Sequence, residues 1–435
     1  MSRAMKHSGI EWIGEIPKEW RQYRIKYNTF LKGRIGWQGL NSNDFIDEGY
    51  CLITGTDFDN KGGINWNTCY RISKERFDED ELLHVKEGDL LMTKDGTVGK
   101  MAIIKALPEE ASLNSHLLII RQLTNLIDNS FLYWAMLSDV FKGFCLYYQS
   151  GTIMSSISQS TLGFFACYCP SLSEQQKIAN YLDKVCGEVD EMIALQEQMI
   201  EELRAYKQSV ITEAVTKGLN PDVPMKDSGI DWIGEVPVHW EVRRIGNLFK
   251  LRDEKNYMPM DEVQLLSLYT GIGVFPHGEQ EERGNKAITV EGYKVVHKDD
   301  IVVNIILAWM GAIGVSNYDG VTSPAYDVYI PDLSKVVPHF FHYVFRTQGI
   351  AGECYKYGRG IMMMRWRTYS SEFKQIRVPF PSMEEQQLIA DFLDTKCSEI
   401  DALIAIKQAK IDELKDYKKS VIYEYVTGKK EVGED

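Results

Sequence analysis

The stretch "EQQKIANYLD" at Glu174–Asp183 returns in this chain as "EQQLIADFLD" at Glu385–Asp394. The two copies lie 211 residues apart, and the offset holds without a gap as far as "SVITEAVT" and "SVIYEYVT" near the ends of the two segments. An internal repeat of this kind means that the same structural unit is built more than once. The pair therefore predicts one architecture that occurs twice in 435 residues.

Both repeated segments carry the pattern of a long helix. Each begins with Ser-x-x-Glu directly after a proline, which is typical of a capping box. Apolar residues then recur at steps of three, four and seven, and such steps place them on one stripe of a helix. The narrow stripe and the dense charge favour two rods that pair as a coiled coil over the alternative of two amphipathic helices on separate cores.

A second repeat stands before each of the two long inserts. It reads "SGIEWIGEIPKEW" at Ser8–Trp20 and "SGIDWIGEVPVHW" at Ser228–Trp240. The second copy follows the first helix after the linker "GLNPDVPMKD", whereas nothing comparable follows the second helix. If the helices are antiparallel, the N-terminal copy can occupy the place of the missing third copy and close a pseudo-two-fold ring. The tryptophans of both copies are then predicted to anchor the joints: Trp12, Trp20, Trp232 and Trp240.

The inserts differ from each other but belong to one class. Short β-like runs such as "EGDLLMTKDGTVGKMAII" and "YKVVHKDDIVVNIILAW" alternate with helical runs such as "NSFLYWAMLSDVFKGF". Each insert is therefore expected to be a mixed α/β domain within an α+β chain. We expect four parts: a first domain at 1–170, a first helix at 171–219, a second domain at 220–381 and a second helix at 382–428.

The charge is distributed unevenly along the chain. The net charge is −13, and the segments 171–227 and 382–435 carry −5 each, whereas 21–170 and 241–381 carry −2 and +1. The inserts could therefore present a basic face. The eight cysteines lack the spacing of a disulfide framework, and no apolar run suits a membrane span or a secretory signal. We expect a reducing cytoplasm and no membrane contact.

No catalytic or metal-binding constellation is found in the sequence. "GTVGK" at Gly96–Lys100 lacks the first glycine and the hydroxyl residue of a phosphate loop. His339 and His342 stand three apart in an aromatic helix, which is more typical of packing than of metal binding. We therefore predict no catalytic residue and no metal site in this chain.

The paired "SGIxWIGExPxxW" and "EQQxIAxxLD" segments, with "GDLL" at Gly88–Leu91 and "SPAYDVYIP" in the second insert, resemble the specificity subunit of type I restriction-modification systems. The resemblance implies that the inserts are target-recognition domains and that the helices form an antiparallel coiled coil. It also implies a subunit that does no chemistry and holds no cofactor. Its partners would be double-stranded DNA, two modification subunits that methylate adenine with S-adenosylmethionine, and restriction subunits; ATP and Mg²⁺ are expected on these partner subunits.

Base edges are read by polar and basic side chains on exposed loops. The candidates for DNA contact are Lys94, Thr97, Ser150, Gly151 and Thr152 in the first insert, and Asn304, Arg359, Arg365 and Arg367 in the second. Two other interpretations remain open from the sequence: a coiled-coil protein scaffold without DNA readout, and a self-sufficient enzyme with an unfamiliar site.

Overall fold

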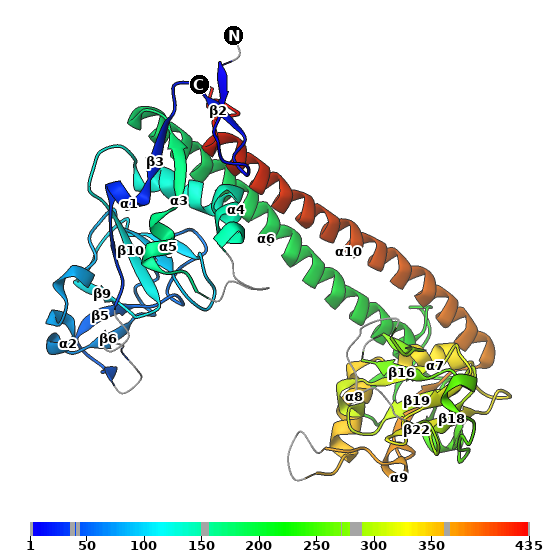
Figure 1. The fold of residues 1–435 in the computed structure, drawn as a ribbon. Coiled ribbons are helices and arrows are strands. Elements are labelled where there is room, and N and C mark those ends of the chain that lie inside the picture. The colour runs from blue at the N-terminus through cyan, green and yellow to red at the C-terminus, as the bar shows by residue number, and fades with distance from the viewer. Residues whose placement is uncertain are drawn as a thin grey trace. The chain divides into compact units, whose positions relative to one another are not determined.

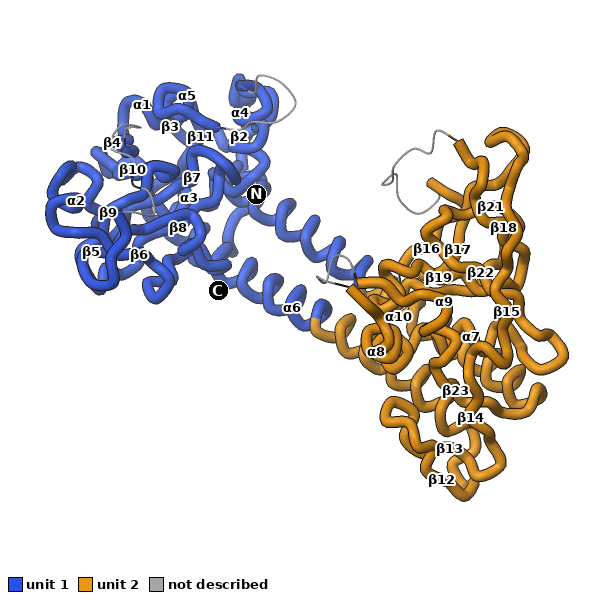
Figure 2. Tube along the Cα trace, turned by 90° about the horizontal axis from the view of Figure 1, so that it is seen from below, with its two compact units in different colours: residues 1–197, 408–435 blue, residues 198–407 orange. Residues whose placement is uncertain are grey.

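The structure is a computed structural model, and it describes residues 3–34, 40, 44–148, 156–270, 272–278, 289–360 and 366–433. The chain divides into two compact units (Figure 2). Unit 1 comprises Met1–Glu197 and Gln408–Asp435, and unit 2 comprises Gln198–Lys407. Each unit therefore contains one insert and an end of each long helix.

The two long helices are α6, Leu172–Lys217, and α10, Met383–Val426, with 46 and 44 residues. In unit 1 the beginning of α6 lies beside the end of α10 (Figure 1). The Nζ of Lys418 donates to both carboxylate oxygens of Asp190 at 2.7 Å, and the rings of Tyr181 and Tyr425 lie 4.6 Å apart. Residue numbers rise along α6 as they fall along α10, so the predicted antiparallel pairing is confirmed.

In unit 2 the end of α6 packs on the beginning of α10. The Nζ of Lys207 donates to the carboxylate of Asp401 at 2.6 and 2.7 Å. Asp401 stands 211 residues after Asp190, and Lys418 stands 211 residues after Lys207. The two ion pairs are therefore copies of one contact, as a pseudo-two-fold repeat requires.

Unit 1 is built around a four-stranded antiparallel sheet in the order β4-β10-β7-β8, with β4 at Thr29–Lys32, β10 at Leu117–Gln122, β7 at Leu90–Thr93 and β8 at Met101–Ile103. Its central strands read "LLIIRQ" and "LLMT", and their apolar residues are buried. The smaller sheets are β1-β2 (Met5–His7, Glu15–Pro17), β3-β11 (Arg21–Arg24, Ala166–Cys169) and β6-β5-β9 (Tyr70–Ile72, Tyr50–Ile53, Ala111–Leu113). The short helices of the insert are α1 (Ile25–Asn28), α2 (Lys74–Asp78), α3 (Asn129–Leu137), α4 (Asp139–Tyr148) and α5 (Gln159–Gly163).

Unit 2 repeats this frame. Its four-stranded sheet has the order β15-β22-β19-β20, with β15 at Phe249–Leu251, β22 at Tyr326–Pro331, β19 at Ile301–Asn304 and β20 at Ile313–Val315. The two-stranded sheets are β12-β13 (Met225–Asp227, Glu235–Pro237), β14-β23 (Glu241–Arg244, Arg377–Phe380), β16-β17 (Leu266–Tyr269, Gly273–Pro276) and β18-β21 (Lys294–Val296, Gly320–Thr322). Its short helices are α7 (Pro338–Val344), α8 (Gln348–Tyr357) and α9 (Ser370–Phe373), and the turn after β14 is a 3₁₀-helix at Ile245–Asn247.

Each unit has a core shared by its insert and the long helices. In unit 1, Trp20 and Phe131 lie in one cluster with Leu182 of α6 and Val426 of α10. An insert that shares its core with the helix ends cannot tilt freely on them. Within the described part of the chain, no helix is long and apolar enough to cross a membrane.

Candidate nucleic-acid interface

A buried glutamine at the start of each long helix fixes the insert to that helix. Gln175 is fully buried, and its Nε2 donates to the carbonyls of Leu126 and Pro170 at 3.0 and 2.9 Å. Its Oε1 accepts from the backbone N–H of Asp128 at 2.8 Å, just before α3. Three hydrogen bonds of one buried amide therefore define how this insert is mounted on α6.

Unit 2 has the same set of three hydrogen bonds around a buried glutamine. The Nε2 of Gln386 donates to the carbonyls of Lys335 and Pro381 at 3.1 and 3.0 Å, and its Oε1 accepts from the N–H of Val337 at 2.7 Å. Glutamines are seldom fully buried unless they are hydrogen-bonded in this way. The second residue of the repeated "EQQ" is therefore explained by mounting and not by DNA contact.

The aspartate that ends "EQQxIAxxLD" is a second mounting point. Asp183 accepts from the indole N–H of Trp134 in α3 at 2.8 Å. Asp394 accepts from the hydroxyl of Tyr343 and lies 2.6 Å from Nε2 of His339, both in α7. This contact accounts for one of the two histidines of the aromatic helix, because His339 faces a carboxylate.

The four predicted anchor tryptophans lie at the joints between helix ends and inserts. Trp20 and Trp240 are each 1% exposed. Each long helix ends at a left-handed glycine beneath one of these indoles, with Gly428 (φ 69°) under Trp20 and Gly218 (φ 76°) under Trp240. A side chain on Gly428 would lie 2.5 Å from Pro17, so glycine serves here both as a helix stop and as a space for the joint.

The other two tryptophans pack on glycines of the insert helices. A Cβ on Gly143 of α4 would lie 2.4 Å from the indole of Trp12, and one on Gly349 of α8 would lie 2.2 Å from that of Trp232. Both indoles are partly buried against the cores of their units. The repeated segment Ser8–Trp20 is thus held from two sides, by the end of α10 at Trp20 and by α4 at Trp12. Its second copy, Ser228–Trp240, is held in the same way by the end of α6 at Trp240 and by α8 at Trp232.

The two joints differ in how they use the capping glutamate. In unit 2, Glu385 caps α10 reciprocally with Ser382 and also accepts from Nε1 of Trp240 at 3.0 Å, with His239 at 2.8 Å. Burial opposes ionisation of Glu385, but these hydrogen bonds outweigh it and lower the pKa of the carboxyl. In unit 1, Glu174 instead pairs with Arg3 at 2.7 Å.

Two of the residues predicted to contact DNA in the first insert are described by the structure. Lys94 follows β7, is partly buried, and its Nζ donates to the carbonyl of Arg34 at 3.3 Å. Thr97 is exposed, and its carbonyl accepts from the hydroxyl of Thr93. Ser150, Gly151 and Thr152 lie outside the described residues.

In the second insert, Arg359 and Arg367 lie side by side. Their backbones exchange two hydrogen bonds of 2.9 Å, and the side chain of Arg359 is 73% exposed and pairs with Glu372 of α9. Asn304 is only 7% exposed, and its Oδ1 accepts from the N–H groups of Ile306 and Leu307 at 3.0 and 3.3 Å. Asn304 thus closes the turn after β19, and the carbonyl of the next residue, Ile305, accepts from the N–H of Thr368 beside Arg367 at 2.8 Å. Arg365 lies outside the described residues.

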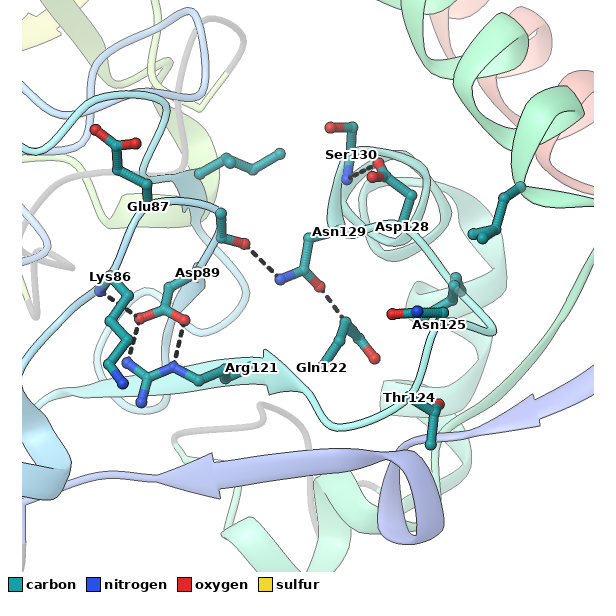
Figure 3. A pocket seen from close by; sticks show the side chains of 14 residues that line it. Lys86, Glu87, Asp89, Arg121, Gln122, Thr124, Asn125, Asp128, Asn129 and Ser130 are labelled. Carbon is teal, nitrogen blue, oxygen red and sulfur yellow. Dashed lines mark hydrogen bonds and ion pairs between the residues drawn. The ribbon is translucent and has the colours of Figure 1, made fainter.

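A polar cavity of about 420 Å³ lies beside β7 and β10 in unit 1 (Figure 3). The carboxylate of Asp89 at its wall accepts from Nε and Nη2 of Arg121 at 2.7 and 2.6 Å and from the N–H of Lys86 at 2.7 Å. Asn129 donates from the other side to the carbonyl of Gly88 at 2.6 Å. Both oxygens of the carboxylate are occupied, so the arrangement suits a structural clamp better than an acid–base group.

Unit 2 has the equivalent clamp with its arginine on another strand. Asp300 accepts from Nε and Nη2 of Arg252 at 2.8 and 2.9 Å and from the N–H of His297 at 2.8 Å. Arg252 follows β15, whereas Arg121 lies on β10, which corresponds to β22. Across the described residues, no group of three His, Cys, Asp or Glu side chains is placed to hold a metal ion.

The family comparison agrees with this duplicated architecture. The type I restriction modification DNA specificity domain matches the chain twice, at residues 36–205 and 237–416. The chain is 27% identical to the putative type I restriction enzyme MjaX specificity subunit of Methanocaldococcus jannaschii, covering 96% of this chain and 95% of that one. It is 23% identical to the MjaVIII specificity subunit of the same organism, covering 95% and 93%.

Two solved structures share the fold. One chain, from work on complex assembly and conformational transition of the type I R-M system, superposes with a TM-score of 0.70 at 14% identity, covering 95% of this chain and 99% of that one. The HsdS subunit from Thermoanaerobacter tengcongensis superposes with a TM-score of 0.52 at 15% identity, covering 95% and 98%. With two matched domains, two inserts on repeated mounts and an antiparallel helix pair, the chain belongs to the family of type I restriction-modification specificity subunits.

Proposed function

We propose that the insert of each unit reads one half of a bipartite target in double-stranded DNA, and that α6 and α10 set the distance between the half-sites. The observation that carries the proposal is the duplicated mount. The same glutamine, aspartate and tryptophan contacts fix two dissimilar inserts to the two ends of one helix pair. Such a frame suits two recognition domains that bind their half-sites independently and are held at a fixed distance by one helix pair.

The helix pair is also the proposed docking surface for two modification subunits. Its acidic segments would repel a phosphate backbone and suit a protein partner better. Adenine methylation would then take place on those subunits with their S-adenosylmethionine, and ATP and Mg²⁺ would serve restriction subunits in the full complex. The chain itself would be non-catalytic, and its proposed compartment is the cytoplasm.

Methylation mapping of the reassembled complex tests the proposal. Methylated adenines on a plasmid library should define two short half-sites with an indifferent gap between them. Inserting one heptad after Gln196 and one after Lys407 should lengthen only the gap, because both helices grow while the inserts stay unchanged. A changed half-site with the original gap would refute the proposal that the helix pair sets the distance between the half-sites.

A further inference from the structure

The first strand and the last strand of each insert meet at a joint that both units share. In unit 1 the chain turns from β3 into α1, and the N–H of Ile25 donates to the carbonyl of Phe165 at 3.2 Å. In unit 2 it turns after β14, and the N–H of Ile245 donates to the carbonyl of Ile376 at 2.9 Å. The offsets of the two repeats, 220 and 211 residues, make these joints equivalent position by position.

A lysine and a glycine have exchanged places across this joint. In unit 1, Lys26 faces Gly163, where an added Cβ would lie 3.7 Å from the Cβ of the lysine. In unit 2, Gly246 stands at the position of Lys26 and faces Lys374, at the position of Gly163, with a corresponding separation of 3.0 Å. Each joint therefore carries one lysine on one glycine, although the lysine comes from opposite sides of the contact.

Arginines accompany the lysine in both units. Arg24 and Arg244 occupy equivalent positions at the ends of β3 and β14, and both are exposed. Arg244 stands directly opposite the exposed Arg377 in the sheet of unit 2. Like charges in directly opposed strand positions destabilise a sheet. The cluster of unit 2 therefore carries an electrostatic cost that an anion would relieve, whereas in unit 1 Arg24 stands opposite Ala166 and its Nε donates to Oε1 of Gln22 at 3.2 Å.

These cations have no carboxylate of their own. Within the described parts of the chain, none of the five basic side chains of the two joints forms an ion pair, whereas Arg243 beside them pairs with Glu241 at 2.7 Å. The set comprises Arg24 and Lys26 in unit 1, and Arg244, Lys374 and Arg377 in unit 2.

We propose that these two cation clusters bind phosphates of the DNA backbone, one cluster at each half-site. The inference rests on the proposed function and adds to it a phosphate-binding surface at the joint. Positive charge is what the two joints have in common. Lys26 lies beside two aromatic residues, Tyr27 and Phe164. Their equivalents in unit 2 are the polar residues Asn247 and Gln375, so the aromatic character is not shared.

A duplicated surface that preserves charge but no apolar centre suits a polyanion, because protein interfaces bury an apolar core. The joint is also tied to the region predicted to contact bases. Helix α9 leads into Lys374, and its Glu372 holds the exposed Arg359. Phosphate contacts near base contacts are the usual means of fixing register on a duplex.

The test is the salt dependence of binding between a fluorescent DNA duplex of mixed sequence and the chain assembled with its modification subunits. Each phosphate contact contributes about 0.9 to the slope of log affinity against log salt. We expect Lys26→Gly, Arg24→Gln, Lys374→Gly and Arg244→Gln each to reduce the slope by about 0.9. The matched control is Lys226→Gln, which removes an exposed cation of β12 that lies outside both the inserts and the helix pair.

The exchanged positions allow a rescue experiment. A Cβ on Gly163 would make only ordinary contacts, the nearest at 3.7 Å with Lys26, so Lys26→Gly combined with Gly163→Lys should move the lysine to the arrangement of unit 2 and restore the slope. Restoration would show that the place of the charge matters and that the single variant was not merely misfolded. Failure of the exchange to restore the slope, with both variants assembled, would overturn the proposal.

Other outcomes separate the alternatives. If the variants bind DNA with the wild-type slope but lose modification subunits in gel filtration, the clusters bind a protein surface and the proposal is wrong. If the wild-type complex binds no duplex, the proposed function falls together with this inference. An unchanged slope beside normal assembly overturns the phosphate contacts alone and leaves the two-reader function intact.

Discussion

The buried amide groups of Gln175 and Gln386 are the residue-level basis of the duplicated mount. Each satisfies a backbone N–H and two carbonyls where the insert meets a long helix. Gln175→Leu or Gln386→Leu would leave these groups buried without partners, at about 1–3 kcal/mol for each such group. We expect each variant to lower the stability of its own unit by at least about 2 kcal/mol in urea unfolding followed by circular dichroism.

The neighbouring glutamines provide matched controls for these substitutions. Gln176 and Gln387 are exposed and bond only to Asn180 and Asp391 one turn further along their helices. Their change to leucine should alter stability by less than about 0.5 kcal/mol. Equal losses of stability at the buried and the exposed glutamines would contradict the role of the buried amides in fixing the inserts to the helices.

His342 makes unit 2 sensitive to acid. It is partly buried in α7, and burial first, then the positive charges of Arg346 and His339, lower its pKa to about 3. In the unfolded chain this imidazole binds a proton below about pH 6.5, whereas in the folded chain it stays neutral down to about pH 3. The free energy of unfolding therefore falls as pH drops from about 6.5 towards 3. The slope is about 1.4 kcal/mol per pH unit.

His342→Phe should remove this contribution while keeping a ring in the core. Between pH 7 and pH 5, urea unfolding should show about 2 kcal/mol more loss for the wild type than for the variant. His7→Phe, at an exposed position, should retain the wild-type pH dependence. Parallel pH profiles for the wild type and His342→Phe would show that this histidine is not held neutral.

At the scale of elements, the insert helices depend on glycines that admit an indole. Gly349→Ala in α8 would place a methyl group about 2.2 Å from Trp232, and Gly143→Ala in α4 would do the same at 2.4 Å from Trp12. Overpacking of this kind costs about 1–3 kcal/mol. Gly352→Ala, in the same helix α8 but with nothing within 4 Å, should instead be neutral or stabilise by up to about 1 kcal/mol. If thermal unfolding shows equal stability for Gly349→Ala and Gly352→Ala, the close packing of Trp232 on Gly349 is contradicted.

The long helices could be predicted from the sequence because their signal is both periodic and duplicated. Their starts at Leu172 and Met383 follow the Ser-x-x-Glu pattern, although the reciprocal cap forms fully only at Ser382 and Glu385. In unit 1 a distant residue, Arg3, takes the carboxylate of Glu174 instead. A local pattern cannot reveal that a residue 171 positions away competes for the same carboxylate.

The roles of single polar residues were harder to predict, because they depend on burial and on contacts between distant strands. Asn304 carries the donor and acceptor groups of a base reader, yet it closes a turn in the core, where Thr93 does the same work in unit 1. The repeats align Lys26 with Gly246 and Lys374 with Gly163, so along the sequence each lysine has only a glycine as its counterpart. Only the fold, which brings each lysine against a glycine, shows that both joints keep one lysine.

At the scale of the whole chain, the N-terminal motif stands where a third copy of the repeat would follow α10. Arg3 pairs with Glu174 at 2.7 Å and with Glu431 at 3.2 Å, and thus connects the first residues to the start of α6 and to the segment after α10. The hydroxyl of Tyr423 donates to the carbonyl of Ile13 at 2.9 Å. In unit 2 the linker "GLNPDVPMKD" makes the corresponding join covalently.

This closure predicts a functional circular permutant. The old termini would be joined through "GLNPDVPMKD", and the chain would be reopened between Asn220 and Pro221, which are exposed and lie before β12. Termini that lie close together permit such rearrangement, and an exposed loop tolerates the new ends. We expect wild-type circular dichroism, assembly with modification subunits and an unchanged methylation motif.

Arg3 supplies the decisive comparison, because its clamp should matter only while the join is non-covalent. Arg3→Ala removes three partly exposed ion pairs, including that with Glu19, and should lower the stability of unit 1 by about 1 kcal/mol in the wild-type chain. In the permutant the covalent linker keeps both segments together, so the same substitution should cost clearly less. An equal loss in both chains, or a permutant that fails to fold, would show that the N-terminal motif does not complete the ring in this way.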